Sequence, residues 1–292
     1  MGLPSVSIII PVYNAGTTID AQLASLVTQS YGGPWEIIAA DNGSHDDSVA
    51  RVRAWTDRFV DRNATLEVVD ASATPGAGSA RNAGARQATG DLLLFCDADD
   101  TMGDGWLAAM GEALGRYDLV GGAVETALLN PPPRSYWGAP VPDGEHWGEG
   151  ESPSYCIGSN FGLRRAVFEA IGGWSEDYPK GGDDQDICRK AILAGFRQGF
   201  APEAVVHRRH RSTLRALARQ HYGYGWAAVQ LHGKFRGHWP GRSLADAVRA
   251  WLRLVKHVPD VLRAETRGAW VSDAALQAGR LAGCVHHRVF RP

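Results

Sequence analysis

The chain has 292 residues, of which 44% are hydrophobic and 21% charged, and its formal net charge is −2. This length and composition suit one large domain, or one domain with a helical appendage, and exclude a disordered or fibrous protein. The apolar runs are much shorter than the ~20 residues that a membrane-spanning helix needs. No basic segment precedes the first apolar run, so we expect no signal peptide. The four cysteines are scattered without a CxxC pair, which favours a reduced, cytoplasmic protein.

The charge is distributed very unevenly along the chain. Residues 1–206 carry 14 Lys and Arg against 28 Asp and Glu, whereas residues 207–292 carry 16 against 4. The basic segment suits two interpretations: a solvated helical face, or a surface for an anionic partner such as the phosphates of a lipid headgroup. In the second case the protein would make peripheral contact with the inner face of a membrane. The segment contains no nucleic-acid recognition motif, so we expect no nucleic-acid partner.

Strand and helix patterns alternate over the first 125 residues. Short apolar or β-branched runs predict buried strands, at 6–11, 35–41, 66–71, 90–97 and 118–124. Apolar residues at helical spacing predict helices between them, after Thr17 or Thr18, after Ser44, at 80–89 and at 105–117. This alternation is typical of βαβ units, so the expected fold class is α/β, with a mostly parallel central sheet and flanking helices.

The second half of the chain is less regular. Residues 129–154 contain a PPP run, further Gly and Pro and several aromatic side chains, which predicts a long loop. Helices are expected at 164–171, at 184–194 and throughout 207–292, with interruptions at Gly223, Gly225 and Pro240.

Three carboxylates follow the fourth predicted strand. Asp97 and Asp99 are two residues apart, so in an extended chain both point to the same side, with the small Ala98 between them. Two carboxylates so close in a partly buried site do not both ionise easily, and a divalent cation resolves this conflict. Mg²⁺ and Mn²⁺ take carboxylate oxygens together with substrate phosphates. The alternative is a loop of solvated aspartates in which Asp100 or Asp104 caps the next helix.

Other predicted strand ends also suit a phosphate-bearing ligand, because ligands of open α/β sheets bind beyond the carboxyl ends of the strands. The first strand leads into PVYN at 11–14, and the second ends at Asp41, which can contact a base or ribose or simply form a turn. The loop PGAGSARNAG resembles a dinucleotide fingerprint, but Arg81 stands where that fingerprint needs its third glycine. Arg81 and Asn82 near a helix start suit phosphate or sugar contacts instead.

A second acidic cluster begins a predicted helix, in KGGDDQDICRK at 180–190. The helix dipole favours negative charge there, so Asp183, Asp184 and Asp186 can be simple capping residues. Three acids after two glycines exceed what capping needs, however. One of them can serve as a general base that takes a proton from an attacking hydroxyl.

Five segments match, in order and spacing, the motifs of a known family: SIIIPVYNAG, AADNGSHDDS, GSARNAGARQATGDLLLFCDADD, NFGLRRAVFEAIGGW and GDDQDICRK. They resemble glycosyltransferase family 2 enzymes of the GT-A fold. The resemblance implies a GT-A catalytic domain followed by a basic helical region at 211–292. Within the domain, 1–210, it implies a nucleotide-binding half at 1–125 and an acceptor-binding half at 126–210.

The resemblance also implies an activity. Such enzymes move a sugar from a nucleotide sugar to an acceptor hydroxyl with inversion, and by family frequency the donor is a UDP-sugar. The chain lacks the QxxRW motif of processive polysaccharide synthases, which favours transfer of a single sugar. The sequence leaves open the sugar, the nucleotide and the acceptor, which is a glycan, a lipid-linked glycan or a small molecule.

Site residues follow from the same resemblance. Those implied to bind the nucleotide sugar are Pro11, Tyr13, Asn14, Asp41, Arg81, Asp97, Ala98 and Asp99. Asp97 and Asp99 match the DxD motif, which together with His207 is implied to hold Mn²⁺ or Mg²⁺. The alternative for His207 is a surface histidine in a basic run.

The second motif carries the implied catalytic base. Asp184 matches that base, Asp183 stands where the family usually has Glu, and Asp186 is a further supporting acid. Trp137 in the long loop and Asn160 are expected to contact the acceptor or the donor sugar; the alternative for Trp137 is packing back on the core.

Two rival interpretations remain. A nucleotidyltransferase also joins a parallel sheet to metal-binding acids, but PVYNAGTTID lacks the glycine-rich basic signature that such enzymes usually carry. A non-catalytic nucleotide-sugar-binding protein would have no use for the acids at 183–186.

Overall fold

The computed structural model describes residues 2–60, 62–134, 137, 156–239 and 242–289. The chain forms two compact units. The first comprises residues 1–125, 155–179 and 183–208, and the second comprises 126–154, 180–182 and 209–292. Each unit is described separately.

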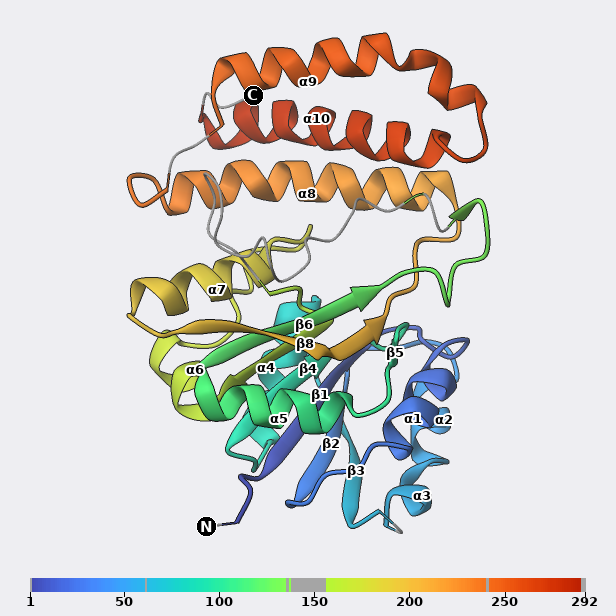
Figure 1. The fold of residues 1–292 in the computed structure, drawn as a ribbon, viewed down its shortest axis with the longest axis vertical. Coiled ribbons are helices and arrows are strands. Elements are labelled where there is room, and N and C mark those ends of the chain that lie inside the picture. The colour runs from blue at the N-terminus through green and yellow to red at the C-terminus, as the bar shows by residue number, and fades with distance from the viewer. Residues whose placement is uncertain (1, 61, 135–136, 138–155, 240–241, 290–292) are drawn as a thin grey trace. The chain divides into compact units, whose positions relative to one another are not determined.

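The first unit is built on one eight-stranded sheet with the order β3-β2-β1-β4-β7-β6-β8-β5 (Figure 1). The strands are β1 (Val6–Val12), β2 (Trp35–Asp41), β3 (Ala64–Asp70), β4 (Leu92–Cys96), β5 (Thr101–Met102), β6 (Leu119–Glu125), β7 (Asn160–Arg164) and β8 (Gln198–His207). β3, β2, β1 and β4 run parallel, β7 runs antiparallel to both β4 and β6, and β8 is parallel to β6. The expected α/β fold is confirmed, with a sheet that is parallel up to β4 and mixed beyond it.

Helices cover both faces of this sheet. They are α1 (Ile19–Val27), α2 (Ser48–Arg53), α3 (Thr56–Val60), α4 (Ala77–Gln87), α5 (Trp106–Arg116), α6 (Arg165–Ile171) and α7 (Asp183–Leu193). Ile8 and Ile10 of β1 belong to the large core that includes side chains of α1 and α5. Because side chains alternate along a strand, Ile9 points to the other face. There it meets α4 at Gly84, where a Cβ would lie 2.6 Å from the Ile9 side chain.

Two predicted helix starts are wrong in position. Ser44 does not begin a helix: its hydroxyl accepts a hydrogen bond of 3.0 Å from the main-chain N–H of Asn14, and the helix starts only at Ser48. The helix predicted at 80–89 is α4, which starts earlier, at Ala77. Gly76 has a φ of 131°, and this conformation ends the loop directly before the helix.

Three strands were absent from the sequence prediction. β7 and β8 lie in the part of the chain after 129 where strand patterns were not recognised, and β5 has only two residues. β7 joins the two halves of the sheet, because it pairs with β4 on one side and β6 on the other.

The second unit contains three helices and a 3₁₀ segment among its described residues: α8 (Leu214–Lys234), α9 (Leu244–Lys256), η3 (Val258–Leu262) and α10 (Arg267–His287). α10 packs against both α8 and α9 (Figure 1). Over the residues that the structure covers, no helix is both long and apolar enough to cross a membrane.

The predicted interruptions at Gly223 and Gly225 are wrong, because α8 runs through both positions. Gly225 of α8 and Gly279 of α10 allow close packing of the two helices. A Cβ at Gly225 would lie 2.0 Å from the carbonyl oxygen of Leu276 in α10, and a Cβ at Gly279 would lie 2.0 Å from that of Tyr222. Glycine therefore lets two helix backbones touch. The interruption expected at Pro240 lies outside the described residues.

Candidate active site

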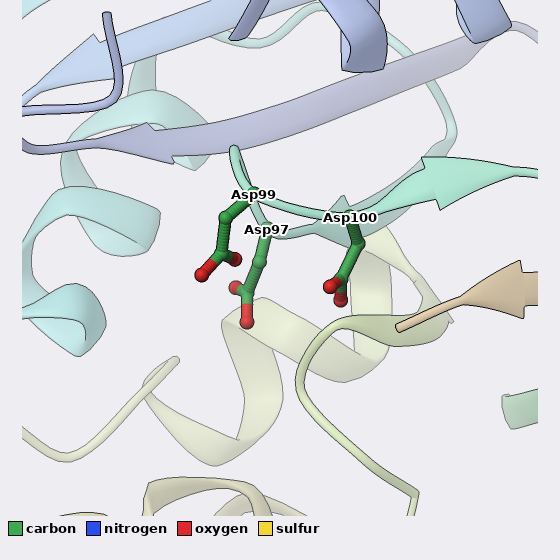
Figure 2. Close-up of side chains that lie close together, drawn as sticks. All are labelled: Asp97, Asp99 and Asp100. Carbon is green, nitrogen blue, oxygen red and sulfur yellow. The ribbon is translucent and has the colours of Figure 1, made fainter. Parts of the chain in front are cut away.

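The acids after β4 converge on one point. Asp97, Asp99 and Asp100 each offer a carboxylate oxygen, and these atoms lie within 4.8 Å of one another. Figure 2 shows the three carboxylates on the same side of the chain. The predicted reason for this is wrong: residues 98–99 form a turn and not an extended strand. Tight turning, and not strand alternation, brings these side chains together and adds Asp100 to the pair that the sequence indicated.

This acid cluster has the chemistry of a site for a hard divalent cation. Its donors are all carboxylate oxygens, which are the ligands that Mg²⁺ and Mn²⁺ prefer. Asp97 and Asp99 are partly exposed, so a ligand can reach them, whereas Asp100 is buried. The residues present therefore fit the implied metal.

Arg81 of α4 connects this acid cluster to the second acidic motif. Its guanidinium donates one hydrogen bond to Asp97 and another to Asp183, each of 2.8 Å. Arg81 is only 5% exposed, and its guanidinium stacks on the Trp174 ring at 4.7 Å from the ring centre. A buried guanidinium needs such anionic partners, because it stays protonated under all conditions. One side chain thus holds carboxylates from the end of β4 and from the start of α7 side by side.

Two neighbouring features fix Arg81 in place. The amide of Asn82 donates to the carbonyl oxygen of Trp174 and accepts from its main-chain N–H, each at 2.9 Å. This pair of bonds holds the tryptophan whose ring covers the guanidinium. Gly158 lies against the other side, where a Cβ would come within 3.2 Å of Arg81 Nη2. Asn82, which the sequence suggested for phosphate or sugar contact, is buried and is occupied by these structural bonds.

Asp184 lies in the first turn of α7, directly after the aspartate that pairs with Arg81. Burial, and after it the negative charge of Asp183, raise the pKa of Asp184 to about 7. A carboxyl with a pKa near neutrality can accept a proton during a reaction at physiological pH. The third acid of the motif has a different place: Asp186 is completely buried, accepts a hydrogen bond from the Ser175 hydroxyl and lies 3.7 Å from Lys190. Asp186 therefore anchors α7 to its surroundings.

The ends of β1 and β2 form a hydrogen-bonded rim at the same sheet edge. Asn14 has a φ of 48°, a conformation that asparagine tolerates better than most residues. Its side-chain oxygen accepts from the N–H of His45 at 2.9 Å, and Asp41 Oδ1 accepts from the N–H of Ser44 at 3.2 Å. The predicted residues Tyr13 and Asn14 are exposed and Pro11 and Asp41 are partly exposed, so all four are accessible to a ligand. Ala98 is buried within the acidic turn.

Two residues predicted for ligand contact lie in structural positions. Asn160 is completely buried: its amide donates to the carbonyl oxygens of Ala123 and Ala204, each at 2.8 Å, and accepts from Trp106 Nε1 at 2.7 Å. Both amide N–H donors are thus engaged within the protein, and the side chain is not exposed to a ligand in this conformation. Trp137 belongs to the second unit and is 9% exposed. Its ring packs on Gly268 of α10, where a Cβ would lie 2.3 Å away.

His207 lies at the end of β8, where it pairs with Thr101 of β5. Its Nδ1 is 2.8 Å from Glu125 Oε2. Among the described residues, the group that could hold a metal contains the three aspartates and does not include His207. A ligand role for His207 stays a prediction that this arrangement does not support.

Solved structures with the same architecture define the class of protein. The mannosyltransferase PcManGT from Pyrobaculum calidifontis, solved with GDP-Man and Mn²⁺, matches with a TM-score of 0.68 and 20% identity, over 96% of this chain and 87% of that one. TarS 1-349 from S. aureus, solved with UDP-GlcNAc, matches with a TM-score of 0.54 and 20% identity, over 78% of this chain and 66% of that one. The fold is therefore that of the GT-A glycosyltransferases.

The family follows from the sequence comparisons. The model of glycosyl transferase family 2 matches residues 7–172, more than half of the chain, and that of glycosyl transferase family group 2 matches residues 148–264. The chain belongs to glycosyltransferase family 2.

Curated relatives match this chain over part of their own length. A pre-mycofactocin glycosyltransferase of Mycobacterium tuberculosis is 28% identical over 238 residues, which are 77% of this chain and 47% of the relative. Glycosyltransferase AglE of Haloferax volcanii is 34% identical over 131 residues, 44% of this chain and 42% of the relative. This chain thus spans about half the length of the curated relatives it matches.

Proposed function

We propose that the protein transfers one sugar from a nucleotide sugar to an acceptor hydroxyl, with inversion at the anomeric carbon and with Mn²⁺ or Mg²⁺ as cofactor. The observation that carries this proposal is the shared guanidinium of Arg81. It places Asp97 of the acid cluster and Asp183 of the second motif within 2.8 Å of one side chain. A base next to Asp183 is therefore held close to the acids that would receive the donor's diphosphate.

The donor is a nucleoside diphosphate sugar bound along the carboxyl ends of β1, β2 and β4. Asp41, Asn14 and Tyr13 offer hydrogen-bonding and stacking groups for the nucleoside at this edge, as ligand binding in open α/β sheets requires. We take a UDP-sugar as the first candidate. The solved relatives include one with GDP-Man and one with UDP-GlcNAc, so both nucleotides are tested below.

Asp97, Asp99 and Asp100 are the residues that would hold the metal. When bound, the cation supplies positive charge that stabilises the departing diphosphate. Arg81 is the protein's own contribution of positive charge at this place. It also keeps the acids in position, because its two hydrogen bonds fix the carboxylates of Asp97 and Asp183 relative to each other.

Asp184 acts as the general base. Its carboxylate takes the proton from the acceptor hydroxyl, whose oxygen forms a bond to the anomeric carbon as the bond to the diphosphate breaks. A single displacement of this kind inverts the configuration. The pKa of about 7 suits the task, because the group is basic enough to accept a proton and still largely ionised slightly above neutrality.

The acceptor is a hydroxyl of a glycan, a lipid-linked glycan or a small molecule. One curated relative is a UDP-Glc:α-D-GlcNAc-diphosphoundecaprenol β-1,3-glucosyltransferase of Escherichia coli, 33% identical over 103 residues, and this favours a lipid-linked acceptor. We place the reaction in the cytoplasm, where nucleotide sugars and reduced cysteines both occur.

The experiment compares donor binding with turnover. Thermal-shift titrations of UDP- and GDP-sugars, with Mn²⁺ or with EDTA, should show stabilisation that needs both the nucleotide and the metal. Release of nucleoside diphosphate from the stabilising donor, by hydrolysis or transfer, should then be lost in Asp184→Asn while donor binding stays. Asp104→Asn, an exposed aspartate, is the control. Turnover by Asp184→Asn at the wild-type rate, or donor binding unaffected by EDTA, would contradict the proposal.

A further inference from the structure

Helix α9 of the second unit has two separate apolar faces. The first consists of Ala247, Ala250 and Leu254, which are buried, and α9 packs against α10, where Trp270 donates a hydrogen bond of 3.0 Å to the carbonyl oxygen of Leu254. The second face we call the α9 stripe. It consists of Leu244, Val248, Trp251, Leu252 and Val255, all of them exposed. With about 100° per residue, these five positions fall within about 100° of the helix circumference, beside the buried face and distinct from it.

A row of basic side chains borders the α9 stripe. Arg249, Arg253 and Lys256 are exposed and lie on the side of the helix away from the buried face. The single acid of the helix, Asp246, is engaged in the capping box with Ser243 and pairs with Arg249. The apolar surface continues past the end of α9, because Val258 and Leu262 of η3 are exposed as well.

An exposed apolar stripe of this length marks a surface that is covered by a partner, because soluble proteins seldom leave such patches in water. The bordering charges decide which partner. A second copy of the chain, joined through the same stripe, would bring the two rows of Arg and Lys towards each other, and like charges repel. A partner with a negatively charged surface and an apolar interior would complement both the α9 stripe and the basic row. A lipid surface has these properties, and a helix with apolar, tryptophan-containing and basic faces lies in its plane.

We propose that the α9 stripe docks onto an anionic lipid bilayer, with its apolar side chains among the acyl chains and Arg249, Arg253 and Lys256 at the lipid phosphates. This is a docking surface that does not cross the bilayer. It does not depend on the proposed function, because it lies in the second unit and uses none of the residues assigned to sugar transfer.

The test measures co-sedimentation with vesicles of phosphatidylcholine alone and of phosphatidylcholine with phosphatidylglycerol. The chain should sediment with the anionic vesicles, and added salt should release it. Val255→Glu puts a charge into the stripe and should weaken binding about tenfold or more, since it exchanges a membrane-buried valine for a carboxylate. Val60→Glu is the matched control: Val60 of α3 is 66% exposed and Val255 is 69% exposed. Val60→Glu should bind like the original chain.

A second pair of variants tests the basic row. Arg253→Glu should weaken binding to anionic vesicles, whereas Arg53→Glu, at an exposed arginine of α2, should have little effect. Urea unfolding verifies that each variant is folded. The proposal is overturned if the chain does not sediment with anionic vesicles, or if Val255→Glu and Val60→Glu bind these vesicles equally well. It is also overturned if Val255→Glu instead converts a dimer in solution to a monomer.

Discussion

Replacing Asp184 by asparagine should stabilise the protein, and more strongly at higher pH. In the folded chain burial and Asp183 raise the pKa of Asp184 from 3.8 to about 7. Between these two values the folded state holds a proton that the unfolded state releases, so stability falls as pH rises through this window, and it stays low above the folded-state pKa. Asparagine does not ionise, so the stability of the variant does not fall in this pH window for this reason. From the two pKa values, the gain on substitution is about 1 kcal/mol at about pH 4.5 and about 4 kcal/mol at about pH 8.

The measurement is urea unfolding of the chain and of Asp184→Asn at both pH values, with EDTA present so that no cation binds the acids. The informative quantity is the difference between the two gains, because a change in packing would be the same at both pH values. Asp104→Asn should show no such difference, since that side chain is exposed. A gain at about pH 8 that does not exceed the one at about pH 4.5 would refute the assignment of a partly buried carboxyl with a pKa of about 7 at this position.

Three further predictions concern Arg81, Asn160 and the acid cluster. Arg81→Met should destabilise the fold by about 3–5 kcal/mol in urea unfolding, because two partly buried carboxylates lose their common cation; an unchanged unfolding midpoint would contradict the bridging role. Asn160→Ala should lower the free energy of unfolding by about 2–4 kcal/mol, because one buried N–H group and two buried carbonyl oxygens lose their hydrogen-bond partner. A folded variant should still bind the nucleotide sugar normally. Selective loss of that binding would instead support the sugar-contact role of Asn160. Asp97→Asn and Asp99→Asn should each abolish the Mn²⁺-dependent part of donor binding in calorimetry, and an undiminished Mn²⁺ effect in both would remove the metal from the acid cluster.

The parallel half of the sheet is predictable from sequence because each of its strands is a local signal. Runs such as Val6–Val12 and Leu92–Cys96 are buried on both faces and so are almost entirely apolar. β7 and β8 lack that signal. β8 includes Gly, Pro and Glu among its residues, and its strand character comes from pairing with β6, a contact between residues far apart in the chain. Sequence patterns do not report such distant pairings.

The same distinction applies to the site. Each acidic motif is visible by itself, because three aspartates within four residues form a local pattern. The connection between them is invisible, because Arg81 lies 102 residues from Asp183 in the chain and only the fold brings them together. Asn160 shows the opposite case. A polar residue beside a motif looked like a ligand contact, yet its amide bonds β6, β8 and α5 to one another.

Arg81 also changes the argument for a metal. A close pair of carboxylates was taken to need a cation, and the structure supplies one of its own at 2.8 Å from Asp97. One guanidinium carries a single positive charge, however, and it is shared with Asp183. The acid cluster has three carboxylates within 4.8 Å, more negative charge than Arg81 alone can neutralise. A diphosphate would add further negative charge to this place, and a divalent cation held by the acid cluster would offset it. The physical argument for the proposed divalent cation is therefore the combined charge of the acid cluster and the donor, and not the Asp97 and Asp99 pair alone.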